Sequence, residues 1–389
     1  MSFIFADRLS EVGEYFFSKK LEVVQKMKQS GIDVINLGVG SPDLAPADRV
    51  IKKTIETLQL QNSHGYASYR GTIELRQKIS NFYKNTFNVK LAPETEVLPL
   101  LGSKEGVLYV SMALLNPGDS VLIPNPGYPA YSSVAKLLGV NILYYDLLDA
   151  SDWLPDFSQI EKLDLSRCKL MWVNYPHMPT GRAPTQKLFN DLVSFGKNNS
   201  ILICNDNPYS LVLHQDSPLS ILNADKNKLT TLELNSLSKS FNMAGWRVGM
   251  LAAAQPVVDA VLQVKSNVDS GMFMPIQAGA IEALSMDSQW HLERNKIYQE
   301  RRSFVVEIFN EIGFKHDDKQ IGMFIWAKAP DHISDVVRYC DKILEKAHVF
   351  ITPGKVFGSN GDRYARIALC ASKERLREAL DRIKKTGLR

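Results

Sequence analysis

The sequence contains few cysteines and histidines, and none of them is grouped. Its 389 residues include only four cysteines and seven histidines. No two histidines have the spacing of a metalloprotease or zinc-finger pair, and no cysteine pair has metal-ligand spacing. The widely separated cysteines are Cys168, Cys204, Cys340 and Cys370. We therefore expect reduced, mostly buried thiols and no metal centre.

Long apolar runs and a strong excess of one charge are also missing. No segment is long enough to span a bilayer, and the first residues lack the basic region and apolar stretch of a signal peptide. The 46 basic and 42 acidic residues give a net charge of +4 and are spread along the chain, so no basic stripe indicates nucleic acid. We expect a cytoplasmic protein with small-molecule partners and neither nucleic-acid nor membrane binding.

The middle of the chain alternates apolar strands with helices. With 45% hydrophobic residues, a chain of this length can bury a large core and form two domains. Strands are expected at 96–101, 120–124, 169–174, 201–204, 230–235 and 249–254, with helices at 103–115 and 186–197. This alternation predicts an α/β fold: a three-layer sandwich with a mainly parallel sheet covered on both faces.

Both ends of the chain predict a smaller α+β domain. A helix is expected at 11–30 and a strand at 33–39. After about residue 285 we expect a helix at 291–312, strands at 322–326 and 364–369, and a final helix from 373. The predicted division is 1–44 for the N-terminal segment and part of the small domain, 45–285 for the large ligand-binding domain, and 286–389 for the C-terminal small domain. The two domains should share a cleft.

Lys239 lies on a turn between two predicted strands, where functional side chains are often placed. A lysine amine can form an imine with an aldehyde, while Ser236, Ser238 and Arg247 could hold the anionic tail of that aldehyde's carrier. A lone lysine on a protein surface is usually a solvated charge, so the surrounding residues decide whether Lys239 has a function. The pattern suggests an enzyme that uses pyridoxal 5′-phosphate (PLP).

Three further segments fit such a cofactor. Asp206, at a strand end, could keep a pyridine nitrogen protonated and Tyr209 could reach the ring's phenolate oxygen, although a turn-forming aspartate is the alternative. The segment 102–106 could receive a phosphate at a helix start, or simply be a serine helix cap. Tyr128 could stack on a flat ring, with core packing equally compatible.

Several motifs resemble the class I/II aminotransferases of PLP fold type I. They are NYPHMPTG at 174–181, SLSK at 236–239 followed by Arg247, and RIAL at 366–369. The resemblance covers nearly the whole chain, from Asn36 to Arg366, in the order found in the family. Segments 102–106, 126–129, 242–247 and 265–271 are most similar to the bacterial LL-diaminopimelate aminotransferase-type group.

The resemblance also implies roles for individual residues. Lys239 would form the internal aldimine and move a proton between the substrate α-carbon and the cofactor's C4′. Asp206 would pair with the pyridinium nitrogen, Tyr209 with the phenolate oxygen, and Tyr128 would stack on the ring. Arg366, helped by the backbone at Gly38, would bind the substrate α-carboxylate. The phosphate would be bound by Gly102, Ser103, Lys104, Ser236, Ser238 and Arg247, and by Tyr66 of the second subunit of a homodimer with shared active sites.

Two positions depart from the family pattern. Met178 stands where the family has an asparagine that touches the cofactor and the substrate carboxylate, and a thioether cannot donate a hydrogen bond. Such a bond to a charged group is worth roughly 1.5–3 kcal/mol, so the site should be weakened but not abolished. Arg70 lies near a position that is usually acidic in diaminopimelate-type enzymes. Lys104 could meet a distal carboxylate or remain an exposed lysine at a helix start.

The function expected from these observations is transfer of an amino group between an L-amino acid and a 2-oxo acid, with 2-oxoglutarate as the expected acceptor. Alternatives are LL-diaminopimelate aminotransfer specifically, or a lyase or decarboxylase reaction on the same fold. A regulator domain that binds PLP without turnover is a third possibility. Regulators of this kind usually carry a DNA-binding domain first, and the short segment before Asn36 favours an enzyme. The sequence leaves the amino donor open.

Overall fold

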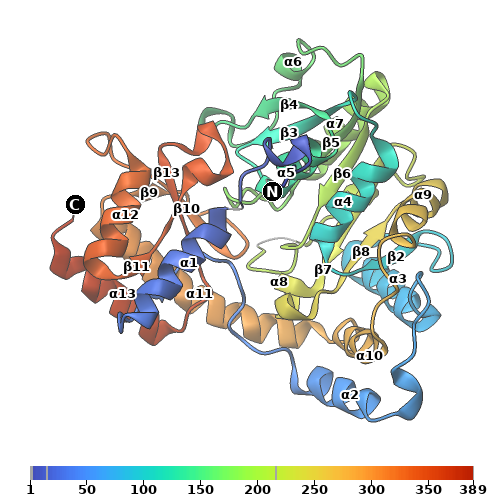
Figure 1. Ribbon diagram of the computed structural model, residues 1–389, viewed down its shortest axis with the longest axis horizontal. Helices are drawn as coiled ribbons and strands as arrows, with labels where there is room; N and C mark the ends of the chain where they lie inside the picture. Colours follow the sequence, from blue (N-terminus) through green and yellow to red (C-terminus); the bar gives the residue numbers. More distant parts are fainter. Residues whose placement is uncertain (1–2, 15, 215–216, 389) are drawn as a thin grey trace.

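A seven-stranded sheet forms the centre of the larger part of the molecule (Figure 1). The computed structural model describes residues 3–14, 16–214 and 217–388. The strand order is β2-β8-β7-β6-β5-β3-β4, and all neighbours are parallel except β8, which runs antiparallel to both β2 and β7. The strands are β2 (Val97–Leu100), β3 (Ser120–Asn125), β4 (Asn141–Asp146), β5 (Cys168–Val173), β6 (Leu202–Asp206), β7 (Thr231–Ser236) and β8 (Gly249–Ala252).

Helices cover both faces of this sheet because successive strand residues point to opposite sides. In β2, Leu98 and Leu100 belong to the core on one face, whereas Val97 belongs to the core on the other. The first face packs against α4 (Ser103–Leu114), α5 (Pro129–Leu137) and α9 (Gln255–Lys265). The second packs against α3 (Ile73–Phe87) and α7 (Gln186–Asn199). The predicted three-layer α/β sandwich with a mainly parallel sheet is confirmed.

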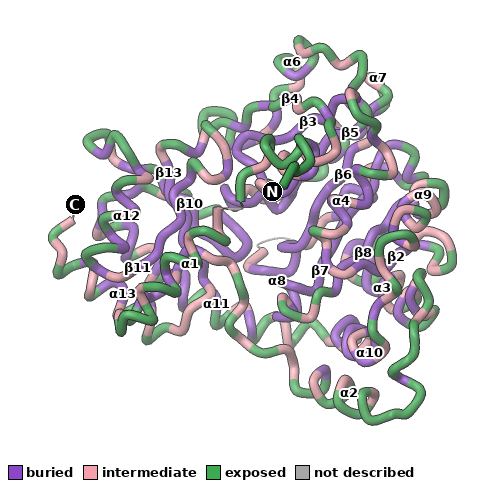
Figure 2. Tube along the Cα trace, viewed as in Figure 1, coloured by how far each residue is buried: buried purple, intermediate pink, exposed green. Residues whose placement is uncertain are grey.

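A smaller antiparallel sheet lies beside the large one. Its order is β12-β13-β10-β9, formed by β9 (Lys315–His316), β10 (Phe324–Lys328), β12 (Thr352–Pro353) and β13 (Tyr364–Ala368). Its helices are α11 (Ser288–Glu311), α12 (Val336–Ala347) and α13 (Lys373–Thr386). Figure 2 shows that the buried segments concentrate along the strands of both sheets.

The N-terminal segment packs against this smaller unit (Figure 1). Strand β1 (Ile35–Asn36) pairs in parallel with β11 (Val349–Phe350). Helix α1 (Phe16–Gln29) buries Val24 in a small cluster with Val34, Leu344 and Phe350. The remaining helices are α2 (Asp48–Leu58), α6 (Phe157–Ile160), α8 (Leu237–Ser240) and α10 (Met274–Ala283), and α2 packs along α10.

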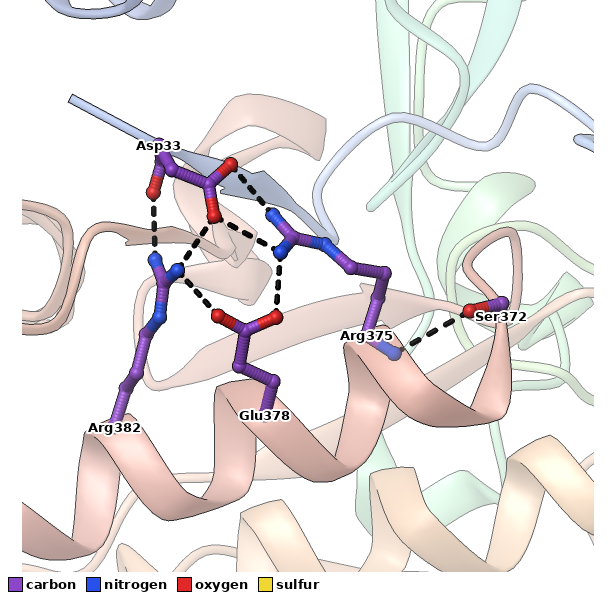
Figure 3. Close-up of polar contacts among 5 residues, drawn as sticks. All are labelled: Asp33, Ser372, Arg375, Glu378 and Arg382. Atoms are coloured by element: carbon purple, nitrogen blue, oxygen red, sulfur yellow. Dashed lines mark hydrogen bonds and ion pairs between the residues drawn. The ribbon is translucent and has the colours of Figure 1, made fainter. Parts of the chain in front are cut away.

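An ion-pair network ties the segment before β1 to the last helix (Figure 3). Asp33 accepts from Arg375 at 2.7 Å and from Arg382 at 2.6 Å, and Glu378 bridges both arginines at 2.5 Å. Hydrogen bonds from Arg375 and Arg382 lower the pKa of Asp33 to about 2. Ser372 caps the start of α13 by accepting from the Arg375 backbone N–H at 3.3 Å.

The main differences from the predicted elements lie near the N-terminus. The described part of the first helix begins at Phe16, five residues later than predicted. The strand predicted at 33–39 is only two residues long, because the Asn36 side chain accepts from the Gly38 and Val39 N–H groups at 3.1 and 3.2 Å and turns the chain away. Strand β4 and helices α2, α3, α5, α9 and α10 were not among the predicted elements.

None of the described helices combines the length and apolar character needed to cross a membrane. No three histidine, cysteine, aspartate or glutamate side chains in the described ranges are arranged to hold a metal ion. All four cysteines are free, and Cys168, Cys204 and Cys340 are buried.

Candidate active site

A cavity of about 590 Å³ opens where the large sheet meets the small one. Asn174, Asp206 and Ser236 reach it from the carboxyl ends of β5, β6 and β7. Phe324 and Arg366 reach it from β10 and β13 of the small sheet. The carboxyl edge of a parallel sheet is where α/β proteins bind ligands, so this cavity is the candidate active site.

Lys239 projects from the short helix α8 into the cavity. Its Nζ donates a hydrogen bond to the Gly40 carbonyl oxygen at 2.5 Å. Burial lowers the pKa of the Lys239 amine to about 8, and repulsion by Arg366 and Arg247 acts in the same direction. A lysine with a lowered pKa has a larger neutral fraction near pH 7, which makes it a better nucleophile.

Asp206 is a buried carboxylate at the cavity wall. It is 3% exposed, and its Oδ2 accepts from the Tyr131 hydroxyl at 3.1 Å. Tyr131 is itself fixed by stacking on Trp172, with ring centroids 4.9 Å apart. The other carboxylate oxygen, Oδ1, has no hydrogen-bond partner within the described chain. Burial raises the pKa of Asp206 to about 6, against the opposing hydrogen bond from Tyr131. A buried oxygen of this kind calls for a donor or cation in the cavity.

The turn before α4 and the segment before β8 together form an anion cradle. Gly102 has φ +93°, and a Cβ there would lie 2.3 Å from Nη2 of Arg247. A Cβ on Gly249 would lie 2.6 Å from the Ser103 backbone nitrogen. Arg247 Nη1 donates to the Ala244 carbonyl oxygen at 2.9 Å. Glycine at both positions therefore lets the guanidinium and the N-terminus of α4 meet, which is the geometry that favours phosphate.

Arg366 forms the opposite end of the cavity. Its guanidinium carbon lies 3.9 Å from the Phe324 ring centroid and 4.5 Å from that of Phe357. Nη2 donates to the Gly38 carbonyl oxygen at 2.9 Å, and Nη1 contacts the Met178 sulfur at 3.2 Å. These contacts orient a flat group with several donors, which suits a two-pronged bond to a carboxylate. Gly38 thus positions Arg366 through its carbonyl group.

The structure brings together most of the residues predicted from sequence. Those that line the cavity are Ser103, Lys104, Tyr128, Met178, Asp206, Tyr209, Ser236, Ser238, Lys239, Arg247 and Arg366. Gly38 and Gly102 lie directly behind Arg366 and Arg247. Tyr66 is 95% exposed and does not line this cavity. Arg70 pairs with Asp259 and also lies outside the cavity of its own chain.

Sequence reasoning missed several residues that the structure places at the site. Asn174 donates to the Asp206 carbonyl oxygen and accepts from the Met178 N–H at 2.9 Å. Its place in the NYPHMPTG motif was the available signal. Tyr131 follows Tyr128 by one helical turn, which also could have been noticed. The apolar wall of the cavity had no local signal; it is formed by Phe17, Leu21, Phe324 and Phe357.

Comparison with known proteins agrees with this geometry. The profile of the family described as "Aminotransferase class I and II" matches residues 32–383. The LL-diaminopimelate aminotransferase of Halothermothrix orenii is 35% identical over 385 residues, 99% of each chain, and that of Moorella thermoacetica is 36% identical over 382 residues, 98% of this chain and 97% of its own. The substrate-bound structure of BacF from Bacillus subtilis superposes with a TM-score of 0.94 at 34% identity, covering 99% of this chain and 98% of its own.

The chain belongs to the class I and II aminotransferases. It is therefore a PLP-dependent enzyme of PLP fold type I, as the sequence predicted, and the regulator domain without turnover is set aside. The cavity offers an amine for an aldehyde at Lys239, an unpartnered buried carboxylate oxygen for a protonated ring nitrogen at Asp206, and a glycine-lined cradle beside Arg247 for a phosphate. The residues fit the cofactor.

Proposed function

We propose that Lys239, Asp206, Arg247 and Arg366 are the core of an active site that transfers an amino group from an L-amino acid to a 2-oxo acid, with 2-oxoglutarate as the expected acceptor. One observation carries the proposal: a lysine amine of lowered pKa, a buried carboxylate and a carboxylate-binding arginine all line one cavity. When bound, PLP supplies an aldehyde that takes up the amino group and a protonated ring that withdraws electrons from the substrate α-carbon.

The chain's own residues would then bind, orient and move a proton. Arg366 binds the substrate α-carboxylate and so fixes the α-carbon relative to Lys239. The Lys239 amine would accept the proton of the substrate α-carbon and deliver it to the cofactor's C4′, as a general base and then a general acid. Asp206 keeps its negative charge opposite the ring nitrogen, with Tyr131 holding the carboxylate in place.

The remaining predicted residues would hold the cofactor. Ser103 and Lys104 at the start of α4 and the guanidinium of Arg247 bind the phosphate, together with two serines whose hydroxyls lie 2.9 Å apart, Ser236 and Ser238. Tyr209 faces the ring oxygen, and Tyr128 stacks on the ring face. Glycine at 102 and 249 leaves room for this arrangement, because a Cβ at 102 would meet the Arg247 guanidinium and a Cβ at 249 would meet the backbone of Gly102 and Ser103.

A half-reaction experiment tests this function. PLP-loaded protein is mixed with one L-amino acid at a time, the visible absorbance of the bound cofactor is followed, and the product is identified by mass spectrometry. The proposal predicts loss of the absorbance with formation of the matching 2-oxo acid, and recovery when 2-oxoglutarate is added. Release of carbon dioxide or an eliminated fragment instead of a 2-oxo acid would show a decarboxylase or a lyase.

Met178→Asn tests the departure from the family pattern. An asparagine amide could donate to the ring oxygen and to the substrate carboxylate, whereas the Met178 sulfur only accepts from Arg366. We expect the visible-absorbance titration of the bound cofactor to move to lower pH in Met178→Asn, because the new donor stabilises the deprotonated form. Met178→Leu, which adds no donor, should titrate like the wild type. An unchanged or higher midpoint in Met178→Asn would contradict this role.

We also propose that the enzyme is a homodimer in which Tyr66 reaches the phosphate of the neighbouring subunit. Tyr66 is almost fully exposed in the single chain. Exposed apolar side chains lie on α2, on the segment 60–73, which includes Tyr66, and on the segment 268–273. The segment 268–273 packs against the backbone at 67–68. The exposed apolar side chains are Ile55, Leu58, Leu60, Ile73, Val268 and Phe273. Exposed apolar side chains on these segments favour an interface.

Sedimentation velocity and PLP titration test the dimer. The wild type should sediment as a dimer, and Tyr66→Phe should bind PLP about tenfold more weakly, because one hydrogen bond to a charged group is lost. Tyr69→Phe, on the same segment, is the matched control and should keep wild-type affinity. A monomer with full activity would refute the assignment of Tyr66.

LL-diaminopimelate is a second candidate donor, since two relatives of 35% and 36% identity carry that name. It has an ammonium and a carboxylate at the end remote from the reacting carbon. Among the described residues lining the cavity, Asp206 is the only carboxylate, and it is assigned to the ring nitrogen. Within the described residues, the cavity of this chain by itself therefore offers no further carboxylate for the distal ammonium group.

A further inference from the structure

One wall of the cavity has no charged side chain. After the residues proposed to hold the cofactor and the α-carboxylate are set aside, the side next to α1 and the small sheet remains. Its side chains come from the first turns of α1, the residue Val39 after β1, strand β10 and the turn at 354–357. They are Phe17, Ser18, Leu21, Val39, Phe324 and Phe357. All but the serine are apolar.

This wall adjoins the carboxylate-binding end of the cavity. The Arg366 guanidinium carbon lies near the ring centroids of Phe324, Phe357 and Phe17, at 3.9, 4.5 and 5.6 Å. In the proposed function the α-carboxylate is held by Arg366 and the α-amino group points to Lys239. Two substituents of the α-carbon are thereby fixed, and the side chain must extend along the surface that is left.

Helix α1 is held in place over this surface. Lys20 forms an ion pair with Asp341 of α12 at 2.5 Å, and Val24 is buried against the small unit. Phe17 and Leu21 lie one turn apart on the helix, so both can face the cavity. Leu21 is 40% exposed, which leaves apolar surface that a bound apolar side chain would cover.

The charged side chains of the cavity are assigned to the cofactor and to the α-carboxylate, and none of them belongs to this wall. Lys104 and Arg247 belong to the phosphate cradle, and Asp206 to the ring nitrogen. A donor with a distal ammonium group, such as LL-diaminopimelate, would have to lose water against phenylalanine and leucine side chains without gaining a carboxylate partner from this chain, which is costly. An aromatic or branched aliphatic side chain pays no such penalty and gains from burial.

We propose that the amino donor is an L-amino acid with a bulky apolar or aromatic side chain, and that Phe17 and Leu21 determine this specificity. The inference rests on the proposed function, because it takes the positions of the α-carboxylate and amino group from it. Phe17 and Leu21 contact the substrate side chain and take no part in proton transfer.

The first test compares donors in the half-reaction. PLP-loaded protein should convert L-phenylalanine and L-leucine with a kcat/KM at least about tenfold above that for LL-diaminopimelate. Conversion of diaminopimelate in preference to phenylalanine and leucine overturns the specificity while leaving the proposed function intact. Absence of conversion with every amino acid overturns the proposed function, and the specificity is then decided by binding alone.

The second test measures binding without turnover. Calorimetry gives the Kd of 3-phenylpropanoate and 4-methylpentanoate, which lack the amino group, against pimelate, the corresponding analogue of diaminopimelate. The apolar acids should bind at least about tenfold more tightly, and Phe17→Ala should weaken 3-phenylpropanoate by about tenfold. Phe17→Leu should restore most of the affinity. Val23→Ala, on the same helix but outside the cavity, is the matched control. Tighter or equal binding of pimelate, or equal effects of Phe17→Ala and Val23→Ala, would contradict the assignment.

Discussion

Replacing Lys239 with alanine is expected to lower kcat by at least about 10²–10⁴-fold with every amino donor, the usual range for a positioned general acid–base group. The methyl group can neither hold the cofactor covalently nor accept the α-proton. The side chain contributes no core packing, since it extends into the cavity and donates only to the Gly40 carbonyl. The melting temperature of the apo protein should therefore change little. Single-turnover kinetics with phenylalanine would measure the chemical step directly.

Lys104→Ala provides the control for that loss. Lys104 is another lysine of the cavity, but it lies at the start of α4 beside the phosphate cradle. Its removal should weaken PLP binding and leave kcat at saturating PLP close to the wild type. A small primary amine added to Lys239→Ala should restore part of the proton transfer. Wild-type turnover in Lys239→Ala, or a larger loss in Lys104→Ala, would overturn the assignment of the general base.

Asp206→Asn is expected to cost about 10²–10³-fold in kcat, the range for removal of one preorganised electrostatic group. The amide keeps the shape and can still accept from Tyr131, but it carries no charge to keep the ring nitrogen protonated. Burial raises the pKa of Asp206 to about 6 in the protein without cofactor. In the PLP-loaded enzyme a protonated ring nitrogen opposite the carboxylate would favour its charged form and lower that pKa again. The loss of kcat in Asp206→Asn should therefore be present at every pH at which the wild type is active, which a pH profile of both proteins would measure.

The stability of Asp206→Asn shows whether its loss of kcat comes from the missing charge or from a disturbed fold. Because the folded-state pKa of Asp206 lies above its ordinary value of 3.8, the folded apo protein holds that proton more tightly than the unfolded chain. The free energy of unfolding of the apo protein should fall as the pH rises from 3.8 to about 6. Above about pH 6 the full cost of burying the charged carboxylate is present. Apo Asp206→Asn should consequently be at least as stable as the wild type at pH 7 to 8. Lower stability together with lower activity would indicate a structural role instead.

The sequence predicted the part of the site that depends on buried parallel strands. Such strands read as short apolar runs, so the positions of β5, β6 and β7 could be found, and with them the strand-end residues Asp206 and Ser236. The loops that follow carry Tyr209 and Lys239, which the structure brings to the same cavity. The family's ordered motifs added Arg366, more than a hundred residues later in the chain.

The parts that could not be predicted depend on contacts between distant segments. Nothing near Phe17 or Leu21 indicates that α1 lies over the cavity, because its anchoring partners are in α12 and β11. The Arg70 side chain pairs with Asp259 on α9, a partner that its own sequence segment does not indicate. The bond from Tyr131 to Asp206 likewise joins residues 75 positions apart. The domain limits at 44 and 285 and the cytoplasmic location stay predictions.

Borohydride reduction followed by peptide mass spectrometry tests the central claim most directly. Borohydride makes the bond between a lysine amine and an aldehyde cofactor permanent, so the modified residue can be read from the digested PLP-loaded protein. The account predicts the mass of reduced PLP on the peptide containing Lys239 and on no other lysine peptide. Modification of Lys104 or another lysine instead, or of none, would contradict the claim that Lys239 is the reactive centre of this aminotransferase.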